Sequence, residues 1–168
     1  MAKTSFKGAP VNTNSDLPAI GSKAPDFKLT TVDLKDVTLA DYKGKRKLIS
    51  IVPSLDTGVC AMSTKKFNEQ MTAKPNAVAL IVSSDLPFAQ SRFCKAEHTD
   101  NVITLSMMRS RHFAKDYGVL LVDGPLEGIT ARAVLVLDEN DKVVYQQLVP
   151  DIASEPDYSK AMASLVGK

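Results

Sequence analysis

The middle of this chain alternates short apolar segments with longer segments of helical periodicity. The apolar segments, 47–53, 77–83 and 102–105, are typical of buried strands, and the segments between them, 58–73 and 86–97, predict helices. Strands separated by helices pair in parallel, because the connecting helix packs back onto the sheet in a right-handed crossover. This alternation constrains the fold most, since it predicts an α/β protein in which helices flank a central sheet.

The segments on either side of this core predict an extension and a closing part of the sheet. Turn-forming residues at 7–10, between segments 4–6 and 11–13, predict an N-terminal β-hairpin extension within residues 1–15. The other expected elements are a strand at 27–31, a helical turn at 39–42, a short helix at 110–117, strands at 133–137 and 143–147 joined by a polar turn, and a helix at 158–166. This order permits a thioredoxin-like fold with a mixed sheet. With 44% hydrophobic residues, we expect a single domain over residues 1–168.

Charge and composition argue against several classes of partner. The 21 basic and 19 acidic residues are scattered and give a net charge of +2, and the longest basic run is KRK at 45–47. This distribution argues against nucleic acid or a membrane surface as the main partner. The first residues, MAKTSFKGAPVNT, lack a continuous apolar segment, so we expect neither a signal peptide nor a membrane span. The expected compartment is the cytoplasm.

One of the two cysteines, Cys60, falls where a predicted strand gives way to a predicted helix. The first turn of a helix has unpaired backbone N–H groups and the positive end of the helix dipole, and both stabilise a thiolate. Gly58 leaves room for a close approach, Thr57 offers a hydroxyl, and Pro53 brings no N–H to the site. This setting favours a reactive nucleophile, but a buried inert cysteine stays an alternative on spacing alone.

The stretch PSLDTGVC, from Pro53 to Cys60, fits the pattern PxxxTxxC, and here the chain resembles the peroxiredoxins and, within them, the thiol peroxidase subfamily. Further segments that resemble that subfamily are SDLPFAQSRFC (84–94), NVITLS (101–106), DGPL (123–126), ARAVLVLDEND (131–141) and EPDY (155–158). The resemblance covers nearly the whole chain. It implies the thioredoxin-like fold and a thioredoxin-dependent peroxidase in which Cys60 is the peroxidatic residue.

Reaction of a thiolate with a peroxide needs a group that stabilises the departing oxygen. We expect Arg132 in this role, because arginine is always charged and holds a planar fork of donors that suits both sulfur and a peroxide oxygen. The resemblance, and not the spacing, implies that Arg132 reaches Cys60. Arg92 is a weaker candidate for a supporting role near the site.

The second cysteine, Cys94, lies in the predicted helix at 86–97. Leu86, Ala89, Phe93 and Ala96 are spaced as the core face of that helix, which places Cys94 beside the core face and partly accessible. A thiol near a sulfenic acid condenses with it to a disulfide. The resemblance implies that Cys94 is this resolving residue for Cys60 within one chain. Without the resemblance, an inert packed cysteine is the better interpretation of Cys94.

The resemblance also implies the partners of the reaction. Two helices rarely hold Cα atoms within the 4.4 to 6.8 Å that a disulfide needs, so we expect local unwinding around Cys60 and Cys94. Thioredoxin is the expected reductant, hydroperoxides are the expected substrates, and a homodimer is the expected assembly. We expect no cofactor.

A metal site is a weaker alternative. Cys94 and His98 are spaced four apart, and Cys60 and His112 could complete a set of four ligands. No CxxC or HxxxH pair anchors such a site, so we expect no metal.

Two functional classes remain to be weighed. In the first, the chain is an enzyme that reduces hydrogen peroxide and organic hydroperoxides in antioxidant defence, and apolar residues near Cys60, among them Leu55, Val59 and Phe88, favour organic substrates. In the second, the same scaffold is a redox sensor that oxidises once and turns over poorly. A thiol-disulfide oxidoreductase is a third and weaker hypothesis, because the chain lacks CxxC.

Overall fold

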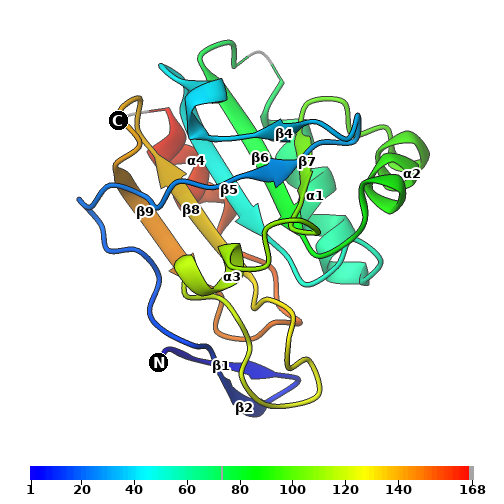
Figure 1. The fold of residues 1–168 in the computed structure, drawn as a ribbon, viewed down its shortest axis with the longest axis vertical. Coiled ribbons are helices and arrows are strands. Elements are labelled where there is room, and N and C mark those ends of the chain that lie inside the picture. The colour runs from blue at the N-terminus through cyan, green and yellow to red at the C-terminus, as the bar shows by residue number, and fades with distance from the viewer. Residues whose placement is uncertain (73, 167–168) are drawn as a thin grey trace.

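The computed structural model describes residues 1–72 and 74–166, and its centre is a seven-stranded mixed sheet (Figure 1). From one edge to the other, the strands are β4 (Asp36–Val37), β3 (Leu29–Thr30), β7 (Ile103–Ser106), β6 (Ala77–Ser83), β5 (Arg46–Ile51), β8 (Ala133–Leu137) and β9 (Val143–Leu148). The three strands β5, β6 and β7 run parallel, and all other neighbours pair antiparallel. The expected mixed sheet of a thioredoxin-like fold is therefore confirmed.

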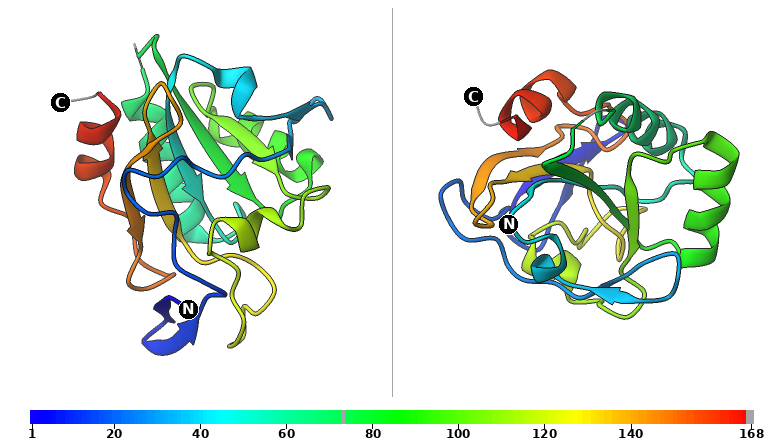
Figure 2. Two further views of the ribbon diagram at one scale, coloured as in Figure 1. Left: turned by 60° about the vertical axis from the view of Figure 1, so that its left-hand side comes forward. Right: turned by 90° about the horizontal axis from the view of Figure 1, so that it is seen from above.

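Helices cover both faces of the sheet because its central strands are apolar on both sides. On one face, α1 (Gly58–Gln70) and α4 (Tyr158–Leu165) pack with Leu48, Val134 and neighbouring side chains (Figure 2). On the other face, the short helix α3 (Phe113–Asp116) and the segment before β3 pack with Ile49 and Leu135. The second crossover helix, α2 (Pro87–Glu97), lies against β7. A 3-10 turn, η1 (Leu39–Tyr42), follows β4.

The N-terminal hairpin forms a separate two-stranded sheet from β1 (Lys3–Phe6) and β2 (Ala9–Asn12), which lies at one end of the molecule (Figure 1). Its two-residue turn is made by Lys7 and Gly8, both with positive φ, as the right-handed twist of a tight hairpin requires. The predicted hairpin is confirmed, with a tighter turn than the 7–10 segment expected.

Most predicted elements are present, and their ends differ by a few residues. The predicted helix at 110–117 is only one turn, Phe113–Asp116, and the predicted strand at 27–31 contributes only Leu29–Thr30 to the sheet. The two-residue strand β4 was not predicted, since so short a segment carries no periodicity. The end of the predicted helix at 58–73 includes residue 73, which lies outside the described residues.

The predicted core face of α2 is partly wrong: Phe93 packs against the core, but Leu86 and Ala96 are exposed. Leu86 is 53% exposed, and the residues that the helix buries fully are Pro87 and Gln90, which were not predicted. Gln90 fixes this face by donating through Nε2 to Ser83 Oγ (3.1 Å) and to the carbonyl of β7 at Leu105 (2.9 Å). Buried hydrogen bonds from Gln90 to the sheet, together with the packing of Phe93, therefore orient the helix.

In the part of the chain that the structure describes, no helix combines the length and the apolar character needed to cross a lipid bilayer.

Candidate active site

Cys60 occupies the first turn of α1, as the sequence predicts. Thr57 precedes the helix in an extended conformation, and Cys60 is its third residue, before the first intrahelical bond from Ala61 N to Thr57 O (3.0 Å). The Thr57 side chain does not cap the helix; its hydroxyl donates back to the carbonyl of Ser54 (3.0 Å). The backbone N–H groups of the first turn therefore face the site and favour a negatively charged sulfur.

Two backbone hydrogen-bonding groups of Val52 fix the start of the segment between β5 and α1. Val52 N donates to Val82 O (3.0 Å), and the carbonyl of Val52 accepts the hydroxyl of Thr130 (3.1 Å). Pro53 follows and is buried, without an N–H that needs a partner. The loop before Cys60 thus begins from a fixed point at the end of the sheet.

Arg132 reaches Cys60 directly. Its Nη2 donates to Cys60 Sγ at 3.1 Å, and its Nε donates to the carbonyl of Ile152 at 2.9 Å. Cys60 is fully buried and Arg132 is 2% exposed. A guanidinium stays charged when buried, so at this distance it stabilises a thiolate in an environment where water cannot. The predicted pairing of Arg132 with Cys60 is present in the structure.

One donor of the same guanidinium is unused. Arg132 Nη1 is buried and has no hydrogen-bond partner among the described residues. A buried unpaired donor is costly, and the other two donor positions are already directed at sulfur and a carbonyl. Arg132 also lines a cavity, although Nη1 itself has almost no exposed surface.

The cavity beside Arg132 has a volume of about 320 Å³. The sequence-predicted residues Pro53, Thr57 and Val59 line it together with Gly58, above which a Cβ would meet nothing within 4 Å. The apolar part of its wall comes from residues that the sequence analysis missed: Phe6, Leu126, Ile129 and Ile152. Cys60 lies behind Arg132 and does not line the cavity.

The expected apolar surroundings of Cys60 are therefore partly wrong. Of the three residues named for them, only Val59 lines the cavity. Leu55 is buried in the same core cluster as Cys60, so it does belong to the apolar surroundings of the sulfur, whereas Phe88 is exposed on α2. The apolar wall is instead built by the hairpin and by loops distant in sequence, which no local pattern reveals.

The hairpin joins this wall through the loop that follows β9. Ser5 N donates to Pro150 O (3.0 Å) and Ile152 N donates to Ser5 O (2.8 Å). The carboxylate of Asp151 accepts the Ser5 hydroxyl (2.6 Å) and the N–H of Gly8 (2.9 Å). These hydrogen bonds, that of the Ser5 hydroxyl first, lower the pKa of Asp151 to about 2. The hairpin thus fixes the loop whose carbonyl at Ile152 holds Arg132.

The end of the segment between β9 and α4 is linked to α1 by an ion pair. Lys66 Nζ lies 2.9 Å from Glu155 Oε1, and the Tyr158 hydroxyl donates to the same oxygen (2.9 Å). The hydrogen bond from Lys66 is the main cause that lowers the pKa of Glu155, and the charge of Arg132 contributes. The EPDY segment is therefore linked to α1, and none of its residues lines the cavity.

Cys94 does not line the cavity beside Arg132. It is half-buried on α2, with Sγ 3.9 Å from Thr104 Oγ1, and it lines a different cavity of about 500 Å³. Both cysteines are free thiols, so the predicted disulfide is not formed in this structure. Arg92 is exposed and lies 3.7 Å from Asp56 Oδ1, away from the cavity beside Arg132.

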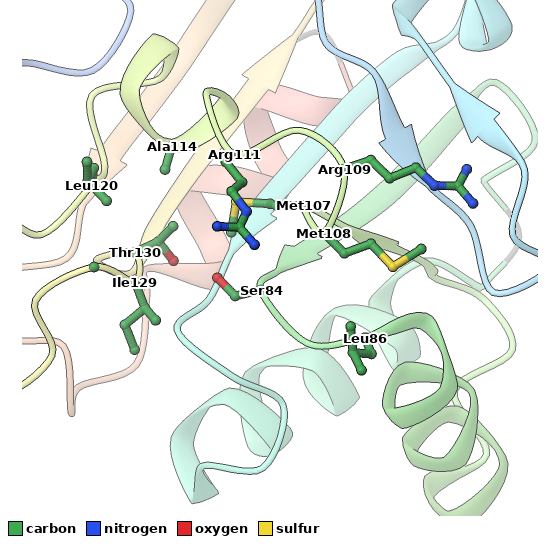
Figure 3. A pocket seen from close by; sticks show the side chains of 11 residues that line it. Ser84, Leu86, Met107, Met108, Arg109, Arg111, Ala114, Leu120, Ile129 and Thr130 are labelled. Carbon is green, nitrogen blue, oxygen red and sulfur yellow. The ribbon is translucent and has the colours of Figure 1, made fainter.

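A larger cavity, of about 610 Å³, is lined by neither cysteine. Figure 3 shows Arg109 and Arg111 on one side of it and Ile129 on another, with Ser84 and Leu86 from the loop between β6 and α2 below. Ile129 also lines the cavity beside Arg132, so the two hollows are neighbours.

The residues considered for a metal site have other contacts. His98 ends α2 in a left-handed conformation, and His112 Nε2 lies 4.0 Å from Asp116 Oδ2. Cys60 accepts a hydrogen bond from Arg132. Over residues 1–72 and 74–166, no three metal-ligating side chains gather at one place.

Comparisons with known proteins agree with this geometry. A sequence model of the Redoxin family matches residues 19–162. A thiol peroxidase of Leptospira interrogans is 47% identical over 166 residues, which cover 98% of this chain and 97% of the relative. A solved structure described as a peroxiredoxin-like protein from Aquifex aeolicus is 40% identical, with a TM-score of 0.93 over 99% of this chain and 96% of that one.

A thiol peroxidase from Chromobacterium violaceum, at 23% identity, shares the fold with a TM-score of 0.89 over 98% of this chain and 95% of its own. The family match covers most of the chain, and the likeness to a thiol peroxidase extends over nearly its full length. The chain therefore belongs to the Redoxin family, and within it to the peroxiredoxins of the thiol peroxidase kind.

Proposed function

We propose that this thiol peroxidase reduces hydroperoxides through Cys60. The thiolate attacks the terminal oxygen of ROOH, a sulfur–oxygen bond forms, the oxygen–oxygen bond breaks, and the leaving oxygen takes a proton and departs as ROH. Cys60 is left as a sulfenic acid. With hydrogen peroxide as the substrate, the product that departs is water.

The observation that carries this proposal is the position of Arg132. One guanidinium donor lies 3.1 Å from Cys60 Sγ, and the unpaired Nη1, although buried, belongs to a side chain that lines the adjoining cavity. A peroxide oxygen that accepts from Nη1 would lie beside the sulfur, and the same charge would stabilise the oxygen as it leaves. Electrostatic stabilisation of this kind is strong where water is excluded.

Thr57 and Pro53 complete the proposed site. The Thr57 hydroxyl gives its hydrogen to Ser54 O, so its oxygen is free to accept a hydrogen bond from the protonated end of a hydroperoxide. Pro53 lines the same cavity and, lacking an N–H, offers no competing donor to the substrate. Since Cys60 itself has no exposed surface, entry of the peroxide requires a small movement of the first turn of α1.

We propose Cys94 as the resolving residue within the same chain. Its sulfur attacks the sulfur of the Cys60 sulfenic acid, a disulfide forms, and the hydroxyl leaves with a proton as water. The two cysteines border separate parts of the fold, and Cys60 is buried under Arg132, so this step requires local unwinding. An external dithiol, with thioredoxin as the proposed donor, then reduces the disulfide.

The cavity favours organic hydroperoxides alongside hydrogen peroxide. Apolar side chains form much of the wall next to Arg132, and transfer of an alkyl group from water to such a wall is favourable. A homodimer and a cytoplasmic location stay predictions, which the resemblance and the composition of the sequence support.

A coupled assay with thioredoxin, its reductase and NADPH tests the proposal. Sustained NADPH consumption that depends on added hydroperoxide is the expected result. A single stoichiometric oxidation without turnover would instead identify a redox sensor. Cys60→Ser is the negative control, because a serine hydroxyl stays protonated at neutral pH and is a poor nucleophile toward peroxide.

A further inference from the structure

A single carboxylate connects the loop before Cys60 to the loop before α2. Asp85 lies in the loop after β6 and accepts three hydrogen bonds: from the Ser54 hydroxyl (2.7 Å), the Leu55 N–H (2.7 Å) and the Ser83 hydroxyl (2.8 Å). The first two donors belong to the segment between Pro53 and Thr57, here called the peroxidatic loop. Hydrogen bonds to a carboxylate are stronger than those between neutral groups.

The network continues from Asp85 into the helix that carries Cys94. The Ser83 hydroxyl, which donates to Asp85, accepts from Gln90 Nε2 (3.1 Å), and Gln90 is fully buried in α2. Ser106 Oγ donates to the backbone carbonyl of Asp85 (2.6 Å), which ties the same loop to the end of β7. The position of Asp85 is therefore fixed by the sheet and by α2.

On the other side, the network reaches the first turn of α1. The carbonyl of Ser54 accepts both the N–H (3.2 Å) and the hydroxyl (3.0 Å) of Thr57, and the Ser54 hydroxyl accepts the N–H of Asp56 (3.1 Å). Release of Ser54 and Leu55 from Asp85 would thus free the segment that positions the helix start. Cys60 lies three residues beyond Thr57.

The two residues next to Asp85 in the chain border an open cavity. Ser84 and Leu86, on either side of Asp85, line the large cavity of Figure 3, and both are exposed. Open space on that side gives the loop room to move. Apart from an exposed ion pair between Arg92 and Asp56, the contact between the two loops is made by the carboxylate of Asp85.

We propose that Asp85 is a positioning residue that latches the peroxidatic loop in the peroxide-reactive conformation, and that opening of this latch permits Cys60 to reach Cys94. This inference rests on the proposed disulfide between the two cysteines. The latch stabilises the conformer in which Cys60 lies under Arg132, and it opposes the conformer in which the disulfide forms. Its strength then sets the rate of disulfide formation.

Asp85→Asn tests the latch with little change in side-chain volume. The amide keeps one acceptor for Leu55 N–H but loses the charge and the second acceptor oxygen. We expect the step from sulfenic acid to disulfide to accelerate about tenfold, which is the effect of weakening one hydrogen bond to a charged group. The preceding reaction with peroxide should be unchanged or slower.

Asp138→Asn is a matched control. Asp138 is also a half-buried loop carboxylate, and it accepts the N–H groups of Asn140 (2.8 Å) and Lys142 (2.9 Å). It follows Leu137, which pairs with Lys47 at the opposite end of β5 from the peroxidatic loop. Asp138 makes these hydrogen bonds away from the peroxidatic loop and from α2. Its substitution should therefore leave both steps at their wild-type rates.

Both steps are measured by stopped-flow under single-turnover conditions, with thiol trapping to follow the disulfide. A faster second step in Asp85→Asn alone, with fewer sulfinic acid products under excess peroxide, supports the latch, because a residue that only stabilises the fold would not accelerate catalysis. An unchanged or slower second step in Asp85→Asn, or equal acceleration in Asp138→Asn, overturns it.

If Asp85→Asn does not fold, Ser54→Ala removes one donor to the carboxylate and should accelerate the same step to a smaller extent; no acceleration overturns the latch. Failure of the proposed function looks different. In that case the wild-type protein itself forms no disulfide between Cys60 and Cys94 after peroxide is added.

Discussion

Arg132 Nη2 lies 3.1 Å from Cys60 Sγ, although 72 positions separate the two residues in the chain and both are buried. The strand β8, which begins next to Arg132, pairs directly with β5, which leads to Cys60. The sheet therefore fixes the approach of the guanidinium to the sulfur. A second bond, from Nε to the carbonyl of Ile152, sets the orientation of the fork.

Arg132→Lys should slow the reaction with peroxide by on the order of a hundredfold or more. A lysine ammonium keeps the charge but lacks the planar guanidinium that donates to the Cys60 sulfur and to the Ile152 carbonyl at the same time. The second-order rate constant for oxidation of Cys60 measures the effect. Arg46→Lys is the control, because Arg46 also donates to backbone carbonyls but lies at the opposite end of β5 from the site, and this variant should react as the wild type does. An equal rate in both variants would remove Arg132 from the reaction.

Cys94→Ser should separate the two half-reactions. Oxidation of Cys60 precedes any role of Cys94, so the first turnover should stay fast. The sulfenic acid should then persist, react with dimedone, and advance to sulfinic acid under excess peroxide. Thioredoxin-dependent turnover should fall sharply, and unchanged turnover would show that Cys94 does not resolve the intermediate.

The contribution of Asp151 to stability should depend on pH. Its pKa is lowered from 3.8 to about 2 by the Ser5 hydroxyl and by backbone N–H groups of the hairpin turn and the following loop. The folded state therefore gains stability from the ionised carboxylate above the unfolded value, and this gain is lost as the pH falls from 3.8 towards 2.

Thermal unfolding of the wild type and of Asp151→Asn tests this dependence. The wild type should be the more stable protein near pH 6, and the difference should shrink through the acid range and vanish near pH 2. A difference that is independent of pH would mean that Asp151 acts by packing and not by its charge.

Much of the fold follows from the sequence because its central strands are buried on both faces. Such strands, β5, β6 and β8 here, read as continuous apolar runs, and the helices between them are long enough to show periodicity. The two-residue strand β4 has no such signal, and α2 is oriented partly by the amide of Gln90, which apolar periodicity does not reveal.

The site was predicted in part. The change from an apolar strand to helical periodicity placed Cys60 at the helix start, but only the family resemblance linked it to Arg132. Phe6, Leu126 and Ile152 could not be found, since the hairpin and two loops bring them together through contacts between distant segments. A single domain over residues 1–168 stays a prediction, which one cooperative unfolding transition would support.

Leu126→Ser should change the choice of substrate. Leu126 is half-buried in the apolar wall beside Arg132, so a polar side chain there should weaken binding of the alkyl group. We expect the rate ratio of cumene hydroperoxide to hydrogen peroxide to fall about tenfold, the scale on which apolar pockets discriminate.

Val144→Ser, at an exposed position on β9, is the control and should keep the wild-type ratio. If Leu126→Ser also keeps that ratio, the substrate does not contact this wall.

The most direct test of the mechanism is the product of a single turnover. The reduced protein is mixed with one equivalent of hydroperoxide, quenched with an alkylating reagent, and mapped by mass spectrometry, with Cys60→Ser treated in parallel. We predict that the wild type consumes the peroxide and yields a disulfide between Cys60 and Cys94 within one chain, while Cys60→Ser leaves the peroxide unreacted. Recovery of alkylated Cys60 after the peroxide is consumed, or of disulfides between chains, would contradict this mechanism.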